Sequence, residues 1–179
     1  MNRQNTNIWK WGNMNVAWTV EGKEINSPIC TLLIHGFGGC KEHWRNNQKI
    51  LGQINPCYAI DLIGFGQSSQ PSSKLKDAPN DAGEYIYCFD TWSNQIADFC
   101  LSIIKKPVIL VGNSIGGVIA LRTGQRLKEF CTGIVLIDCA MRQMDDKRLD
   151  EQSPLMQYIR PYLKAIVKKR WLSQALFRN

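Results

Sequence analysis

The 179-residue sequence predicts an α/β fold in which an antiparallel hairpin precedes a mostly parallel sheet. Three observations predict it. Four short apolar runs, rich in Val, Ile and Leu, have the length of strands buried on both faces. Segments with helical spacing of apolar residues separate these runs, an alternation typical of parallel sheets. At the N-terminus, residues 8–22 instead alternate around Gly12-Asn13, which indicates a hairpin.

The remaining elements follow in chain order. The apolar runs predict buried strands at 29–36, 57–62, 108–112 and 132–139. Apolar spacing predicts helices at 42–51, 90–104 and 115–127. Asp90 or Thr91 is the expected N-cap of the second helix, because both side chains accept hydrogen bonds from backbone N–H groups. A long loop rich in Ser, Pro, Asp and Gly is expected between the second strand and that helix.

The formal charge of +7 is concentrated towards the C-terminus, where residues 154–179 hold six basic residues and no acidic one. Arg160, Lys164 and Lys168 recur every four residues, with apolar residues between them, as on an amphipathic helix. The preferred interpretation is a solvated basic face, and peripheral contact with an anionic membrane stays open. We expect no nucleic-acid partner, because no RNA-binding or helix-turn-helix signature accompanies the basic residues.

Cysteine usage and the N-terminus predict a reducing compartment. The seven cysteines are odd in number, widely spaced and without a C-x-x-C pair, which argues against a disulfide framework or a zinc site. No signal-peptide apolar region and no run of 18 apolar residues occurs. We therefore expect a cytoplasmic, bacterial protein with no metal and no cofactor.

The stretch Gly112-Asn113-Ser114-Ile115-Gly116 fits the pattern G-x-S-x-G between a predicted strand and a predicted helix. In this context Ser114 is the predicted nucleophile, because the flanking glycines permit a sharp turn and the helix N–H groups face a developing oxyanion. The alternatives are a plain glycine-rich turn and a phosphate-binding loop. The residues required for a P-loop or a dinucleotide fingerprint are absent.

A second glycine-rich stretch, "LLIHGFGGC" at residues 32–40, also follows a predicted strand. It predicts a second oxyanion donor, so that the backbone N–H groups of Phe37 and Ile115 form the pair. We expect His35 to be structural, with its ring bonded to the backbone of this loop, and His43 to lie near the surface. The remaining residues expected to shape the site or bind substrate are Gly36, Gly38 and Asn113.

In their order and spacing, "HGFGG", "DLIGFGQS" and "GNSIGG" resemble the α/β-hydrolase superfamily, most of all its epoxide-hydrolase-like and ester-hydrolase branches. "HWRNN" and "VGNSIGGVIAL" are similar to cyanobacterial and plastid members, which include the pheophytinase and chlorophyll dephytylase group. The resemblance implies a partial hydrolase core at 1–140 and the start of a helical cap at 141–179. It places Asp61 and residues 64–66 in a loop beside the site. Epoxide hydrolases and dehalogenases usually have Asp where this chain has Ser114.

The resemblance also implies a triad in the chain order Ser, acid, His, yet no histidine follows His43. Asp138 is the one internal candidate for the acid, because it ends the strand after the nucleophile turn. We therefore expect the base on a separate C-terminal segment. One hypothesis is a serine hydrolase that cleaves a hydrophobic small-molecule carboxylic ester through a Ser114 acyl-enzyme. The other is a catalytically inactive fragment, or partner-binding remnant, of such a hydrolase.

Overall fold

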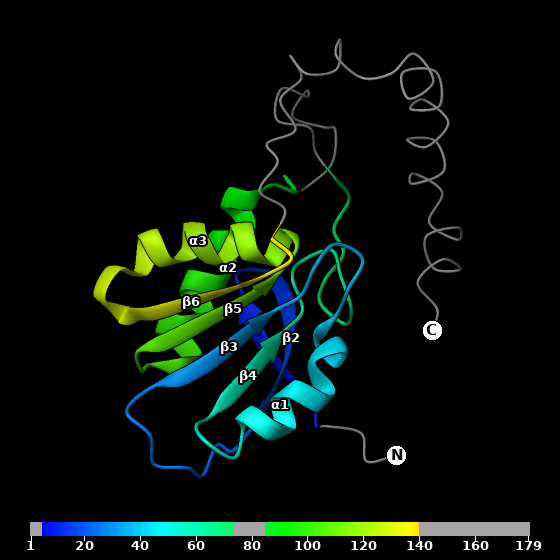
Figure 1. Cartoon of the computed structure of the whole chain (residues 1–179). Helices are drawn as coiled ribbons and strands as arrows, with labels where there is room; N and C mark the ends of the chain where they lie inside the picture. Colours follow the sequence, from blue (N-terminus) through cyan, green and yellow to red (C-terminus); the bar gives the residue numbers. More distant parts are fainter. Residues whose placement is uncertain (1–4, 74–84, 140–179) are drawn as a thin grey trace, which may run out of the picture. The chain divides into compact units, whose positions relative to one another are not determined.

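A six-stranded sheet forms the centre of this computed structural model, which describes residues 5–73 and 85–139 (Figure 1). The strands, in chain order, are β1 (Asn7–Trp11), β2 (Met14–Glu21), β3 (Cys30–Ile34), β4 (Cys57–Ile60), β5 (Val108–Asn113) and β6 (Cys131–Ile137). In space they are ordered β1-β2-β4-β3-β5-β6. Strands β3 to β6 pair in parallel, whereas β1 and β2 are antiparallel. The predicted α/β fold with an N-terminal hairpin is confirmed.

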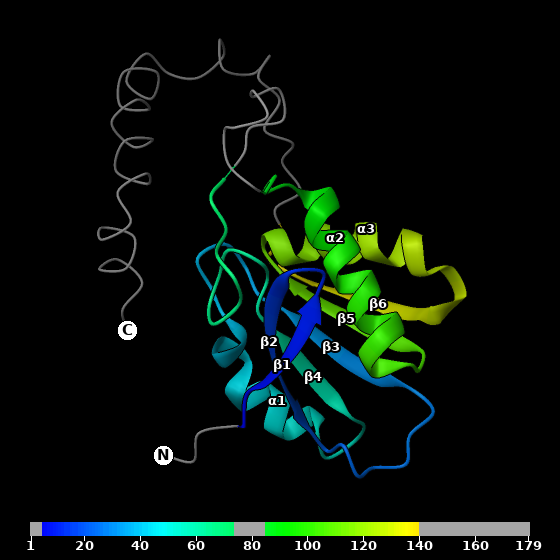
Figure 2. The same cartoon turned by 180° about the vertical axis from the view of Figure 1, so that it is seen from behind.

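Helices cover both faces of the sheet (Figures 1 and 2). They are η1 (Lys41–Trp44), α1 (Arg45–Leu51), α2 (Phe89–Phe99), η2 (Cys100–Ile104), α3 (Ile115–Leu127) and η3 (Lys128–Phe130). Leu32 on β3 packs in a cluster with residues of α2 and α3, and the next residue, Leu33, packs in a second cluster with Trp44. Successive side chains of a strand point to opposite faces, so β3 is apolar throughout because both of its faces are covered.

Two helices differ in detail from the prediction. Residues 41–44 form a 3₁₀ turn before α1, and α2 ends in a π-helical turn at Cys100–Ile104. The N-cap of α2 is Cys88, whose N–H donates to Thr91 Oγ1 at 3.2 Å, so the predicted caps Asp90 and Thr91 are wrong. Asp90 instead pairs with Arg122 and Arg126 of α3. The predicted cap region, 141–179, lies outside the described residues.

Phe99 of α2 anchors the hairpin to the sheet. Its ring centroid lies 5.5 Å from those of Trp9 and Trp18 and 6.2 Å from that of Tyr58. Such edge-on aromatic pairs add to the free energy gained by burying each ring. One side chain therefore joins β1, β2, β4 and α2.

Strand β6 forms an apolar edge of the described sheet. It pairs with β5, and no second neighbour lies within residues 5–73 and 85–139. Four consecutive apolar residues on it are at least partly exposed, namely Ile134, Val135, Leu136 and Ile137. Unpaired apolar edges recruit other chains, because their N–H and C=O groups offer a template for pairing.

We expect the purified chain to self-associate and to bind hydrophobic dyes through β6. Val135→Lys should roughly halve the dye signal and shift sedimentation towards monomer, because a charge on an edge strand opposes pairing. Ile50→Lys is the matched control, since it places the same charge on an exposed apolar position of α1. A monodisperse wild-type monomer without dye binding would contradict this expectation.

Candidate active site

Ser114 occupies a strained turn between the end of β5 and the start of α3. Its backbone has φ 53° and ψ −119°, a region that residues with a Cβ rarely adopt. Two backbone hydrogen bonds hold it: the Ser114 N–H donates to the Ile137 carbonyl and the Gly117 N–H donates to the Ser114 carbonyl, both at 3.0 Å. Strain of this kind costs about 1–3 kcal/mol and persists where the surrounding structure enforces it.

The glycines on either side of Ser114 are required by close backbone contacts. A Cβ on Gly112 would lie 2.2 Å from the Gly116 carbonyl oxygen. A Cβ on Gly116 would lie 2.5 Å from the Ile34 carbonyl oxygen. The two glycines of G-x-S-x-G therefore let α3 start directly against β5 and β3.

The loop at residues 36–40 lies against this turn. A Cβ on Gly36 would lie 2.9 Å from Asn113 Oδ1 and 3.2 Å from Ser114 Cβ. The Gly39 N–H donates to the Gly36 carbonyl at 3.1 Å, and Gly38 has φ 70°, as a type II turn requires at its third position. The structure thus places Gly36 against Asn113 and Ser114, and Gly38 lies two residues further along the same turn.

Two backbone N–H groups near Ser114 lack acceptors within residues 5–73 and 85–139. Ile115 is the first residue of α3, and the first N–H groups of a helix have no intrahelical acceptor. Phe37 follows Gly36 in the turn, and its N–H has no partner in the described part of the chain. Neither N–H group is therefore committed to an acceptor in the described part of the chain.

His35 is buried, and hydrogen bonds occupy both of its ring nitrogens. Nε2 accepts from the Leu62 N–H at 3.1 Å, so Nδ1 carries the proton and donates to the Gly36 carbonyl at 2.8 Å. Burial lowers the pKa of His35, because the charged ring loses its hydration, and so favours the neutral ring. His35 therefore holds the 36–40 loop and has no nitrogen free to accept a proton from Ser114. His43 is exposed on η1.

A buried ion pair beneath the 36–40 loop was missed by the sequence analysis. Lys41 and Asp61 both have fully buried side chains, with Nζ 3.2 Å from Asp61 Oδ2. The Asp61 carboxylate also accepts the backbone N–H of Lys41 at 2.6 Å and that of Gln67 at 2.8 Å. A Cβ on Gly66 would lie 2.2 Å from Asp61 Oδ2, so the turn at 64–66 closes directly over the carboxylate.

Asp138, the candidate acid, follows β6 beside the nucleophile turn. Its neighbour Ile137 accepts the Ser114 N–H, and Asp138 itself is exposed with φ 44°. Aspartate tolerates this left-handed conformation better than most residues. The position is adjacent to Ser114 in the fold, and no histidine of the described residues hydrogen-bonds to Asp138.

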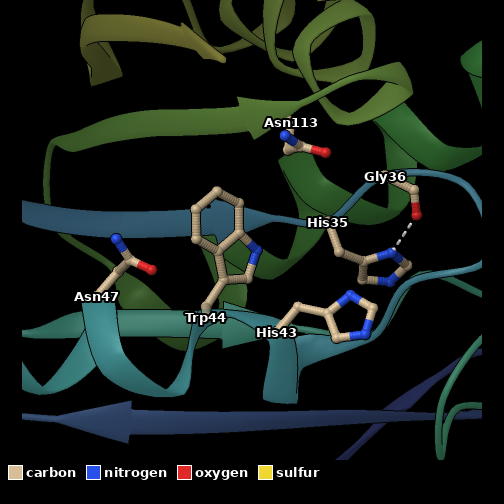
Figure 3. A pocket seen from close by; sticks show the side chains of 6 residues that line it. All are labelled: His35, Gly36, His43, Trp44, Asn47 and Asn113. Carbon is tan, nitrogen blue, oxygen red and sulfur yellow. Dashed lines mark hydrogen bonds between the residues drawn. The ribbon is translucent and has the colours of Figure 1, made fainter. Parts of the chain in front are cut away.

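A small polar pocket of about 200 Å³ opens beside the turn (Figure 3). Its lining residues are His35, Gly36, His43, Trp44, Asn47 and Asn113. The buried Trp44 Nε1 has no hydrogen-bond partner among the described residues, and Figure 3 shows it facing the space towards His35 and Asn113. Within residues 5–73 and 85–139, no cluster of three metal-binding side chains occurs, and no helix is long and apolar enough to span a membrane.

We expect Gly112→Ala to lower the free energy of unfolding by about 1–3 kcal/mol or more, because the new methyl group overlaps the Gly116 carbonyl. Urea denaturation measures the change. Gly133→Ala is the control, since its nearest contacts would be at 3.7 Å, and its effect should stay within roughly 0.5 kcal/mol. Equal stability of the two variants would show that the close approach does not exist.

We expect the free energy of unfolding to fall as the pH drops from about 6.5 to 5, by up to about 1.4 kcal/mol per pH unit. The unfolded histidine takes up a proton in this range, whereas the lowered pKa of His35 shifts its protonation in the folded protein to lower pH. Stability therefore rises with pH here. Urea titrations should show this slope in His43→Gln and a flatter one in His35→Gln. A slope that vanishes only in His43→Gln would refute the assignment of this pH dependence to His35.

Comparison with known proteins places this geometry in a family. A family model described as "alpha/beta hydrolase fold" matches residues 32–174, which is most of the chain. The chain is 29% identical over 149 residues to the 1-acylglycerol-3-phosphate O-acyltransferase ABHD5 of Sus scrofa, covering 83% of this chain and 40% of that protein. It is 28% identical over 127 residues to the human (lyso)-N-acylphosphatidylethanolamine lipase, covering 70% and 35%. The chain thus spans well under half the length of these relatives.

Solved structures give the same fold. A membrane phospholipase A, a bacterial virulence factor, matches with TM-score 0.64 and 30% identity over 86% of this chain and 47% of its own. The haloalkane dehalogenase DatA of Agrobacterium tumefaciens C58 matches with TM-score 0.69 and 17% identity over 98% and 56%, a likeness of fold alone. With the family model, the parallel sheet and the turn at Ser114 in agreement, the chain belongs to the α/β-hydrolase fold family.

Proposed function

We propose that this chain carries the nucleophile and the oxyanion donors of a serine hydrolase that acts on a hydrophobic carboxylic ester. One observation carries the proposal: Ser114 is held at φ 53° directly against Gly36 of a second glycine-rich turn. A strained serine between a parallel strand and a helix, beside two free backbone N–H groups, is the arrangement that acyl transfer requires.

The proposed reaction proceeds in two steps. Ser114 Oγ attacks the ester carbonyl carbon and transfers its proton to a base, while the carbonyl oxygen becomes an oxyanion that accepts hydrogen bonds from the N–H groups of Phe37 and Ile115. Each such donor contributes about 3–4 kcal/mol in the transition state. The intermediate expels the alcohol, which takes up the proton. Water then attacks the acyl-enzyme, releases the carboxylic acid and restores Ser114.

The base in this proposal lies outside residues 1–179. Both nitrogens of His35 are occupied, no hydrogen bond joins His43 to Ser114 in the described residues, and no later histidine occurs in the sequence. A separate C-terminal segment supplying the histidine is consistent with a chain that spans 40% of the length of the pig ABHD5 protein. Asp138 is the internal candidate for the acid, because it follows β6 beside the turn.

The proposed substrate is a hydrophobic, lipid-like small-molecule ester. The human relative is named a lipase of (lyso)-N-acylphosphatidylethanolamine, and the similar solved structure is a phospholipase A. The motif resemblance to the pheophytinase and chlorophyll dephytylase group adds a phytyl ester as a second candidate. The basic residues at 154–179 support peripheral contact with an anionic membrane. The seven free cysteines support a cytoplasmic location, since thiols persist in reducing compartments.

A partner-binding remnant without catalysis is the second candidate. The exposed apolar residues of β6 and the occupied nitrogens of His35 favour it. The coding sequence beyond codon 179 separates the two candidates. A further buried strand followed by a histidine favours the hydrolase, and an immediate stop favours the remnant.

We expect residues 1–179 alone to show no Ser114-dependent hydrolysis of short-chain or long-chain p-nitrophenyl esters. Loss of the base costs on the order of 10⁶-fold in turnover in a serine protease with the same division of roles. Together with the polypeptide encoded downstream, Ser114 should react with a fluorophosphonate probe. The adduct, located by mass spectrometry, should disappear in Ser114→Ala.

Ser102→Ala is the control for this labelling, because Ser102 is an exposed serine remote from the turn. Labelling that persists in Ser114→Ala would show that Ser114 is not the nucleophile. Ser114-dependent turnover by residues 1–179 alone would show that the base lies in this chain after all.

A further inference from the structure

We propose that Lys41 is a positioning residue: together with Asp61, it fixes the 36–40 loop that presents the Phe37 N–H to the substrate's carbonyl oxygen. The inference rests on the proposed function for its catalytic consequence, but its structural part concerns the described residues alone. The observations that carry it are the burial of Lys41 and the way both ends of the loop are tied to one segment.

The 36–40 loop is held at both ends by the two residues that follow β4. At its N-terminal end, His35 Nε2 accepts the N–H of Leu62 at 3.1 Å. At its C-terminal end, the N–H of Lys41 donates to Asp61 Oδ1 at 2.6 Å. The loop has only five residues between these anchors, so the position of Asp61 and Leu62 limits where Phe37 can lie.

The side chain of Lys41 reinforces the second anchor. Its Nζ donates to Asp61 Oδ2 at 3.2 Å, to Gln67 Oε1 at 2.9 Å and to Glu42 Oε1 at 2.5 Å. An ammonium group has three hydrogens, and three acceptors are present. One carboxylate thus binds the main chain and the side chain of the same residue, so any shift of the loop breaks two charge-assisted hydrogen bonds together.

Fold stability alone does not account for this pair. Replacing a buried ion pair with uncharged residues of similar volume is often neutral or stabilising, because removing two charges from water is costly. An apolar pair would not orient the loop, because apolar contacts are non-directional, whereas the hydrogen bonds to Asp61 fix the position of the loop. The pair's effect is therefore expected in the geometry of the loop more than in the free energy of unfolding.

Amide hydrogen exchange of the wild-type chain tests the anchor without any substitution. We expect the Lys41 N–H to exchange as slowly as amides of the central strands β3 and β5, because it donates to a fully buried carboxylate. An exchange rate like that of an exposed loop amide would overturn the proposal. The measurement does not involve Ser114, so failure of the proposed function leaves it intact.

The double variant Lys41→Met with Asp61→Asn tests the positioning role. It removes both buried charges together, and Glu42, which also loses its contact with Lys41, is about half exposed and stays hydrated. We expect the Gly39 N–H, which closes the turn of the loop, to exchange at least about tenfold faster, while the Gly117 N–H behind Ser114 stays within about twofold. The melting temperature should remain close to that of wild type. Lys49→Met, at an exposed lysine of α1, should change none of these quantities.

With the downstream polypeptide present, the same double variant should slow the reaction of Ser114 with the fluorophosphonate by about ten- to a hundredfold, a part of the loss known for removing an oxyanion donor. Unchanged exchange at Gly39 would overturn the proposal. So would a labelling rate in the double variant equal to that of wild type. Absence of wild-type labelling would instead refute the proposed function.

Discussion

At Ser114, three backbone segments approach more closely than a methyl group allows. A side chain on Gly112 or Gly116 would overlap carbonyl oxygens of α3 and β3, at 2.2 and 2.5 Å. This contact fixes where α3 begins, and it forces the serine between the two glycines into a positive φ. The position of the candidate nucleophile therefore follows from backbone packing, and the arrangement of the neighbouring groups depends on it.

The buried polar side chains around the turn also hold the backbone in place. Both ring nitrogens of His35 are hydrogen-bonded to main-chain groups. Asp61 accepts hydrogen bonds from two backbone N–H groups and from the ammonium of Lys41. Buried polar groups are costly unless they are hydrogen-bonded, and those of this cluster are. They connect β3, the segment after β4 and the 36–40 loop at the carboxyl ends of the parallel strands, where α/β proteins bind their ligands.

The sequence was informative where local pattern decides structure. Apolar runs predicted the parallel strands, and the Gly12-Asn13 pair predicted the hairpin. The glycine spacing around Ser114 predicted a turn that the backbone angles now define. The sequence could not order the strands, because pairing depends on contacts between distant segments. It also missed Lys41: a lysine followed by Glu42 and His43 has the pattern of a solvated helix start, and only the fold places Asp61 against it.

The central claim is that the turn at Ser114 and the 36–40 loop together form one oxyanion site. A crystal structure of the protein after reaction with a phosphonate tests it most directly. We expect a phosphorus–oxygen bond to Ser114 Oγ, with the phosphoryl oxygen about 2.7–3.1 Å from the backbone nitrogens of both Phe37 and Ile115. An adduct on Ser114 whose oxygen points away from either nitrogen, or an adduct on another residue, would contradict it.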